Sequence, residues 1–340
     1  MKKLRRALFI SVAIFLLAAG PAFSQMPNFD LSDLDDAINS FSGAMAQSLP
    51  FNATMGLNWS DAYIGQLLSI PPHFGVGISM GATFMNIGVI NDMLSMFEFD
   101  IPLDIPIGFP LPGYTVEGRV GGIILPFDVG IKFGAISPDT IPLLDSMGIG
   151  LNYLLFGMDV RYSVLPSFLP VKLSVGLGFN YLSGGISANL GGGQSFSFDD
   201  PVNSSAHTIA ISDPSLELFW ETTVFELKAQ ASMSLFIITP YAGFGLSYSM
   251  SNAGYRLNSQ VTIDGDPVNE SFAALLSEFF GINNLTDQGF ESRVNADGAI
   301  NFRFFGGFSV NMFVLKLDMT LMYNFTDSSL GGTLGLRLQL

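Results

Sequence analysis

The final segment of the chain, Val314–Leu340, constrains the fold more than any other because apolar and polar residues alternate along it. Apolar side chains occupy every second position from Leu315 to Phe325, and again from Leu334 to Leu340. A β-strand directs successive side chains to opposite faces, so both stretches predict strands with one apolar and one polar face. The apolar face points either into a packed core or outward to lipid, and the rest of the chain decides between these two arrangements.

The same two-residue period recurs along most of the chain. It predicts strands at residues 51–58, 74–84, 99–111, 114–121, 128–135, 154–163, 171–181, 225–235, 242–250, 300–310, 315–325 and 334–340. The segment 99–111 is a weak candidate because proline cannot donate a hydrogen bond to a neighbouring strand. Counting this segment gives about twelve strands, and ten to fourteen remain compatible with the pattern.

The links between these strands alternate in length. Short links are predicted at 125–127, 165–170, 236–240 and 311–313, and longer ones at 60–72, 137–150, 183–219 and 251–299. Transmembrane barrels have short turns at one rim and longer loops at the other. We therefore predict an all-β fold, a transmembrane antiparallel up-and-down β-barrel over residues 51–340, with long outer loops at 183–219 and 251–299. A secreted β-sandwich is the alternative fold.

Composition favours the barrel over a water-soluble sandwich. Charged residues are 13% of the chain and hydrophobic residues 49%, whereas a typical soluble domain has roughly 25% charged residues. No stretch after the N-terminus reaches about 18 consecutive apolar residues, so no transmembrane helix is expected. The absence of cysteine excludes disulfides and thiolate metal sites.

The N-terminus has the pattern of a secretory signal peptide over residues 1–24. Basic residues are followed by the apolar run Leu8–Ala19, and small residues at Ala22 and Ser24 predict cleavage after Ser24. Cleavage would remove Lys2, Lys3, Arg5 and Arg6 and leave ten basic against 29 acidic residues, a net charge of −19.

Residues 25–50 follow as a separate N-terminal segment. Ser32 and Asp35 resemble a helix capping box, and apolar residues recur at helical spacing from Ala37 to Met45. We expect either a short amphipathic helix, in the periplasm or in the barrel mouth as a plug, or a loosely ordered extension. A second amphipathic helix is expected at 270–280, and the sequence leaves open whether 25–50 or 268–280 plugs the barrel.

Most basic residues fall on the polar faces of the predicted strands, whereas most acidic residues fall in loops. The charged residues predicted to line the lumen are Glu117, Arg119, Asp128, Lys132, Asp159, Arg161, Lys172, Glu226, Lys228, Arg303, Lys316, Asp318 and Arg337. Several of these are two residues apart on one strand, such as Glu117 with Arg119, and we expect such neighbours to form ion pairs. The lumen is then either a channel lined by charges or a narrow interior filled by mutually paired side chains.

The sequence offers little for catalysis. Its two histidines are His73, at a strand end, and His207, in a loop a few residues after Asp199 and Asp200. A hydrolase would need a base beside a nucleophile or water, and His207 is the only candidate with nearby carboxylates. An incidental histidine in an acidic loop explains the same residues, so no enzymatic activity, metal or cofactor is expected.

The alternating strands, the signal peptide and the C-terminal strand with Leu334, Leu336, Leu338 and Leu340 resemble bacterial outer-membrane β-barrel proteins of the porin and transporter class. Members of that class usually end in an aromatic residue that the barrel-assembly machinery recognises, whereas this chain ends in leucine. The resemblance covers residues 51–340 and implies residence in the bacterial outer membrane. It also implies contact with outer-membrane lipid and with the assembly machinery through the C-terminal strand.

From these features we expect a porin-like or transport channel for small solutes, with a charge-paired lumen and acidic rims. The alternative is a structural or surface-adhesion barrel with a closed lumen and partner-binding outer loops. No nucleic-acid partner is expected.

Overall fold

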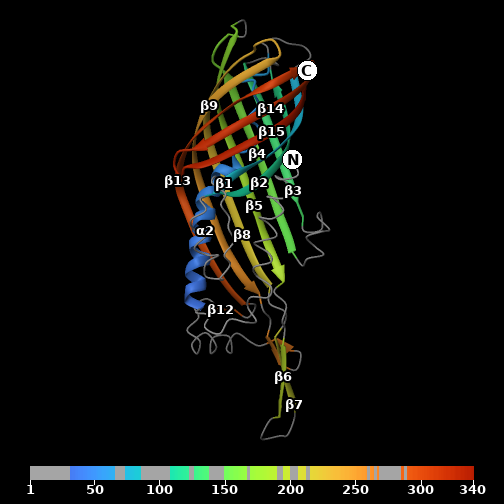
Figure 1. Cartoon of the computed structure of the whole chain (residues 1–340), viewed down its shortest axis with the longest axis vertical. Coiled ribbons are helices and arrows are strands. Elements are labelled where there is room, and N and C mark those ends of the chain that lie inside the picture. Colours follow the sequence, from blue (N-terminus) through green and yellow to red (C-terminus); the bar gives the residue numbers. More distant parts are fainter. Residues whose placement is uncertain are drawn as a thin grey trace.

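Of the strands that the structure describes, ten close into an antiparallel barrel in the computed structural model (Figure 1). They are β1 (His73–Met85), β2 (Phe109–Gly121), β3 (Phe127–Ile136), β4 (Ile149–Ser163), β5 (Val171–Asn189), β8 (Ser215–Met233), β9 (Ile238–Asn258), β13 (Gly289–Met312), β14 (Leu315–Asn324) and β15 (Ser329–Gln339). Neighbouring strands pair in chain order, and β15 pairs with β1 to close the sheet.

The described residues are 31–65, 73–85, 108–121, 126–137, 149–166, 169–189, 194–199, 206–211, 215–258, 261–263, 266–267, 285–286 and 289–340. The predicted signal peptide, the predicted helix at 270–280 and most of the doubtful strand at 99–111 lie outside them. Phe109–Leu111, the end of that doubtful strand, forms the start of β2.

The outer face of the barrel is apolar and its inner face is polar. Leu177 and Leu321 are 67% and 63% exposed, and similar outward-facing side chains occur on every barrel strand. A water-soluble protein rarely exposes a continuous apolar surface of this size, whereas a membrane-spanning barrel requires one. The predicted direction of the faces of the last hairpin is confirmed: Leu334, Leu336 and Leu338 are exposed, and Arg337 is buried.

The short links meet at the rim where the chain ends. They connect β2 to β3, β4 to β5, β8 to β9 and β13 to β14, and the Leu340 amide donates to the Phe74 carbonyl 2.9 Å away at this rim. In Figure 1 this is the upper rim, marked C, and the opposite ends of these strands lie at the lower rim. Among the described residues, no helix is long and apolar enough to cross a bilayer.

The barrel wall is higher on one side because four strands run on into the regions predicted as loops. β5, β8, β9 and β13 have 19, 19, 21 and 24 residues, whereas β3 and β14 have 10 each. Beyond them, β6 (Gln194–Asp199), β7 (Ala206–Ile211), β10 (Val261–Ile263) and β11 (Asp266–Pro267) form a small separate sheet. A two-residue strand, β12 (Leu285–Thr286), pairs with the start of β13.

The helix α2 (Leu31–Ala53) lies inside the barrel along the high wall of β8, β9 and β13 (Figure 1). The hydroxyl of Ser292, near the start of β13, donates to the Asn39 side chain 2.6 Å away, so this part of α2 lies at the long-link end. Met45, Ala46 and Leu49 are buried against apolar wall residues of the lumen, which include Leu155, Leu182, Leu218, Val224, Ala253 and Tyr255. The long-link half of the lumen is therefore an apolar compartment filled by α2.

The strand predicted at residues 51–58 is wrong, and residues 109–111 of the segment predicted at 99–111 begin β2 rather than form a strand of their own. Together these two differences give ten described barrel strands instead of twelve. Residues 51–53 are the last turn of α2, and residues 54–65 run on through the lumen without joining the sheet. Pro50 lacks the amide hydrogen that a continuing helix needs, and the helix ends shortly after it. Of the link predicted at 60–72, the described residues 60–65 lie inside the barrel near the short-link rim and not in an outer loop.

Candidate functional site

All thirteen charged side chains predicted to line the lumen lie on inward-facing positions of the barrel strands. Eleven are buried, and Lys172 and Lys316 are half-buried. Their positions follow from the two-residue period, since each alternates with an apolar residue that faces outward. They belong to the short-link half of the barrel, so the lumen has an apolar compartment near one rim and a charged compartment near the other.

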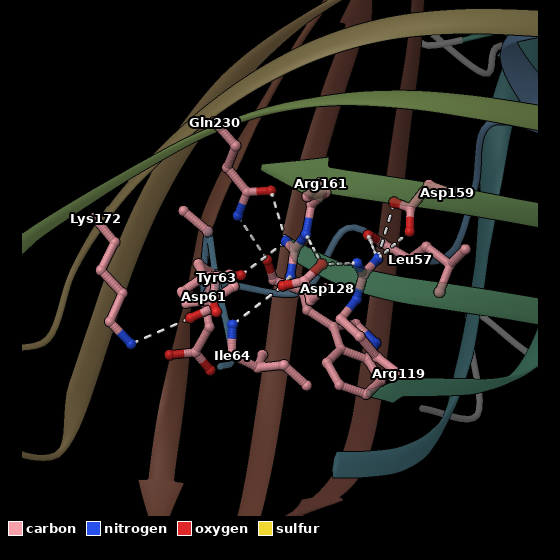
Figure 2. Close-up of polar contacts among 12 residues, drawn as sticks. Leu57, Asp61, Tyr63, Ile64, Arg119, Asp128, Asp159, Arg161, Lys172 and Gln230 are labelled. Atoms are coloured by element: carbon pink, nitrogen blue, oxygen red, sulfur yellow. Dashed lines mark hydrogen bonds and ion pairs between the residues drawn. The ribbon is translucent and has the colours of Figure 1, made fainter. Parts of the chain in front are cut away.

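The centre of the charged compartment is an ion-pair network on β2, β3, β4 and β8 (Figure 2). Asp128 accepts from Arg119 Nη1 at 2.5 Å and from Arg161 Nη2 at 2.7 Å. Asp159 pairs with Arg119 Nη2 at 2.7 Å and with Lys228 Nζ at 2.5 Å. These side chains are at most 4% exposed, so each buried charge is compensated by a partner on another strand.

Two further ion pairs connect strands elsewhere in the lumen. Arg303 Nε on β13 lies 2.6 Å from Glu226 on β8, and Arg337 Nε on β15 lies 2.8 Å from Asp318 on β14. The ion pairs that we expected between residues two apart on one strand, such as Glu117 with Arg119, do not occur among the described residues of the lumen. Outside the lumen, Glu291 and Arg293 on β13 do pair at this spacing, at 3.0 Å. Inside the lumen, the curvature of a small barrel makes side chains on different strands converge, and these side chains pair with each other instead.

Residues 54–65 occupy the middle of this compartment, and every residue in the segment is buried. We call them the lumen segment. Wall side chains donate hydrogen bonds to its backbone carbonyls: Lys132 to Ala53, at the helix end, and to Met55, Arg161 to Asp61, and Lys172 to Tyr63. Wall carboxylates and hydroxyls accept from its amides, including Asp128 from Ile64 at 3.1 Å and Ser232 from Ala62 at 2.9 Å (Figure 2). The lumen segment therefore supplies the hydrogen-bond partners that water would otherwise provide to the polar groups of the lumen wall.

Trp59 anchors the centre of the lumen segment. Its indole nitrogen donates to Glu117 Oε2 at 2.5 Å, and its carbonyl accepts from the Gln230 amide at 2.6 Å. The guanidinium groups of Arg337 and Arg119 lie 4.7 and 5.6 Å from its ring centroid. Because cations are attracted to the face of an indole ring, Trp59 stabilises two arginines that point into the lumen.

Asp61 is the only acidic residue of the lumen segment, and it lies between two basic residues of the wall. Lys316 and Arg337 are directly opposite each other on β14 and β15, a like-charge pairing that is unfavourable by itself. The Asp61 carboxylate lies 2.6 Å from Lys316 Nζ and 2.9 Å from Arg337 Nη2. Burial alone raises the pKa of Asp61, but Arg337, Lys316 and Lys172 outweigh burial and lower this pKa below its ordinary value. Asp61 is therefore charged at neutral pH.

Sequence reasoning missed the lumen segment as part of the site. Phe51, Ala53, Met55 and Leu57 alternate with polar residues as in a strand. The pattern therefore places residues 54–58 in the wall and Asp61 in the link 60–72, and it assigns Trp59 to neither. The available signals were Pro50 and the isolated tryptophan Trp59. Neither signal indicates a chain running through a lumen.

The two histidines lie on different strands. His73 is the first residue of β1, and His207 lies in β7, where its backbone pairs with Phe198. Asp199 pairs with Ala206 in the same hairpin, and Asp200 lies outside the described residues. In the part of the chain that the structure describes, no group of three or more histidine or acidic residues is arranged to hold a metal ion.

No protein-family model matches the chain, and no curated protein matches it. Solved outer-membrane barrels match its shape. The outer membrane protease OmpT from Escherichia coli matches with a TM-score of 0.31 and 9% identity over 79% of this chain and 96% of that one. The translocator domain of the autotransporter NalP from Neisseria meningitidis has a TM-score of 0.31 and 8% identity, covering 92% and 100% of the two chains. The toluene transporter TbuX from Ralstonia pickettii has a TM-score of 0.26 and 8% identity, covering 79% and 89%.

Gly56 provides a test of how tightly the lumen segment is seated. A methyl group added there would lie 2.7 Å from Thr115 Oγ1 and 2.8 Å from Glu117 Oε1, on a backbone with φ of +80°. We expect Gly56→Ala to lower the free energy of unfolding by about 1–2 kcal/mol from the backbone conformation alone. The measurement is urea unfolding of the refolded protein in lipid vesicles, followed by tryptophan fluorescence.

The matched control is Gly43→Ala in the interior of α2. The nearest atom to its added methyl would be Val294 Cγ1 at 3.9 Å, and alanine is favoured over glycine within a helix by roughly 0.5–1 kcal/mol. The two substitutions should therefore change stability in opposite directions. Equal effects would mean that the lumen segment is not held against Thr115 and Glu117.

Proposed function

We propose that the protein is a bacterial outer-membrane channel for small solutes, held closed by its own lumen segment. The observation that supports this function best is the polar character of the wall that surrounds the lumen segment. The wall around the lumen segment is lined by hydrogen-bonding and charged groups, which water can solvate when the segment moves away. A barrel whose lumen never opens would be at least as stable with apolar residues in its interior, because replacing buried ion pairs by apolar residues is often neutral or stabilising.

We also propose the location and the partners that are expected from the sequence. The exposed apolar face contacts outer-membrane lipid, the signal peptide directs export with cleavage after Ser24, and β15 supplies the C-terminal strand to the assembly machinery. The short-link rim then faces the periplasm, and the small sheet of β6, β7, β10 and β11 lies on the outer side. Such a channel acts by passage of solute and carries out no enzymatic reaction.

A reversible disulfide between the lumen segment and the wall tests this function. The hydroxyl oxygens of Ser60 and Ser309 lie 2.8 Å apart, which places the two side chains within reach of a disulfide. The chain has no cysteine of its own, so Ser60→Cys/Ser309→Cys introduces the only thiols. In planar bilayers we expect conductance steps under reducing conditions and none after oxidation, with recovery on adding reductant.

The matched control places the disulfide within the wall. The side-chain oxygens of Thr222 on β8 and Ser251 on β9 lie 2.7 Å apart, and Thr222→Cys/Ser251→Cys links two strands without touching the lumen segment. Oxidation of this variant should leave the conductance steps unchanged. Conductance that persists in the oxidised Ser60–Ser309 variant would show that solute passes without movement of the segment.

The second candidate function is a structural or adhesion barrel whose lumen stays closed. The complete burial of residues 54–65 favours it, as does the small sheet that extends beyond the barrel. The same recordings decide between the two functions. An absence of conductance at every voltage in the reduced protein would remove the channel and favour the closed barrel.

A further inference from the structure

We propose that Lys316 and Arg337 form a binding site for a small oxyanion, such as a carboxylate or phosphate group, and that Asp61 occupies this site as an internal ligand. The inference rests on the proposed channel function and names the class of solute that it takes. We call these two basic residues the anion site.

Two basic residues, Lys316 and Arg337, are paired across neighbouring strands of the wall. These residues are direct cross-strand partners on β14 and β15. Arg337 also contacts the wall carboxylate of Asp318, whereas the carboxylate that Lys316 contacts is Asp61 of the lumen segment. Two cations in this arrangement repel each other, and the Asp61 carboxylate relieves the repulsion by contacting both, at 2.6 and 2.9 Å. A pair of cations bridged by one carboxylate is a site built for an oxyanion.

The lumen wall has a net positive charge when the lumen segment is displaced. On the inward faces of the described barrel strands there are eight basic and five acidic side chains. Every arginine on these faces, and Lys228, contacts a wall carboxylate. By contrast, among the described residues Lys132, Lys172 and Lys316 donate hydrogen bonds to Ala53 and the lumen segment. Lys132 is also the cross-strand partner of Glu117 on β2.

Among the described residues, Lys172 and Lys316 therefore lose their contacts when the segment moves, and the eight basic side chains of the inward faces outnumber the five acidic ones by three. The open lumen carries a net charge of about +3, although the whole chain is acidic at −15. A pore with an excess of one charge on its wall concentrates solutes of the opposite charge. Small anions are accordingly the solutes that this lumen favours.

The first experiment measures the selectivity of the conductance steps with a potassium chloride gradient across a planar bilayer. We expect a reversal potential of the sign set by chloride, and we expect Lys316→Gln to shift it toward zero. The control is Arg293→Gln, which removes a basic group from the exposed ion pair with Glu291 and should leave the reversal potential unchanged. Cation-selective steps, or no effect of Lys316→Gln, would overturn the anion site and leave the channel standing.

The second experiment does not depend on conductance. In a Ser60→Cys variant the thiol is buried beside the anion site, and a maleimide reaches it only when the lumen segment moves. Inorganic phosphate, compared with chloride at equal ionic strength, should increase the labelling rate several-fold by competing with Asp61 for Lys316 and Arg337. Lys316→Gln should remove this acceleration, whereas Arg293→Gln should retain it.

The two experiments separate failure of the inference from failure of the channel. If no conductance is observed at any voltage but phosphate accelerates labelling, the channel function is removed and the anion site stands. If phosphate and chloride give equal labelling rates, the anion site is overturned, whatever the conductance shows.

Discussion

Replacing Asp128 by asparagine is expected to lower the free energy of unfolding by about 3–5 kcal/mol, the range measured when one partner of a buried ion pair is removed. Asp128 is fully buried and is the carboxylate shared by Arg119 and Arg161. In the variant, Arg161 contacts no other carboxylate of the described residues, and Arg119 keeps only Asp159 among them. The loss of unfolding free energy is large because guanidinium groups stay protonated, so a buried arginine cannot reduce its cost of burial by becoming neutral.

The measurement is reversible urea unfolding in lipid vesicles, with Glu291→Gln as the control. Glu291 contacts two arginines as Asp128 does, but it lies on an exposed surface, with its side chain 34% exposed and its arginine partners 37% and 49%. Exposed ion pairs contribute roughly 0.2–1 kcal/mol. Equal losses of unfolding free energy in the two variants would mean that water fills the lumen around Asp128. The position of the lumen segment inside the barrel would then not be its resting position.

Replacing Leu336 by arginine is expected to cost about 2–4 kcal/mol, because the new charge would face the middle of the bilayer. Leu336 is 42% exposed on the outer face of β15. Its cross-strand partners Ile78 and Leu317 are exposed apolar residues on the same face, so no neighbouring group can solvate the guanidinium. The measurement is again the free energy of unfolding in vesicles of defined lipid.

The control is the same substitution at Leu340, which lies on the same face at the short-link rim. Near the membrane surface an arginine costs roughly 0–1 kcal/mol, so Leu340→Arg should be tolerated in refolding experiments. A negligible effect of Leu336→Arg would mean that the outer face does not meet hydrocarbon. The comparison thus tests the membrane location independently of the channel.

The barrel itself was predictable because alternation is a local property. Residues such as Leu336 and Arg337 differ in polarity, and a strand must place them on opposite faces whatever its partners are. The same rule assigned the inward positions of the thirteen charged residues. Strand ends were less predictable: β8 and β9 extend to Ser215 and Asn258, beyond the regular alternation of the membrane-spanning part.

Ion-pair partners were not predictable, because they depend on strand register and barrel curvature. Glu117 and Arg119 share one strand face, yet Arg119 contacts Asp128 and Asp159 on the two following strands. Asp128 and Arg161 are register partners on β3 and β4, and register emerges only when all strands are closed into one sheet.

The sequence alone determined that this chain forms an antiparallel barrel with an apolar exterior and a charged interior, since the two-residue period of a strand carries that information. Only the tertiary structure decided that residues 54–65 lie within the barrel rather than in its wall. Inside a lumen every side chain of a segment is enclosed, so burial no longer alternates and the pattern that marks a strand loses its meaning. The position of Asp61 between Lys316 and Arg337 brings together residues more than 250 positions apart in the chain, and only the closed barrel makes them neighbours.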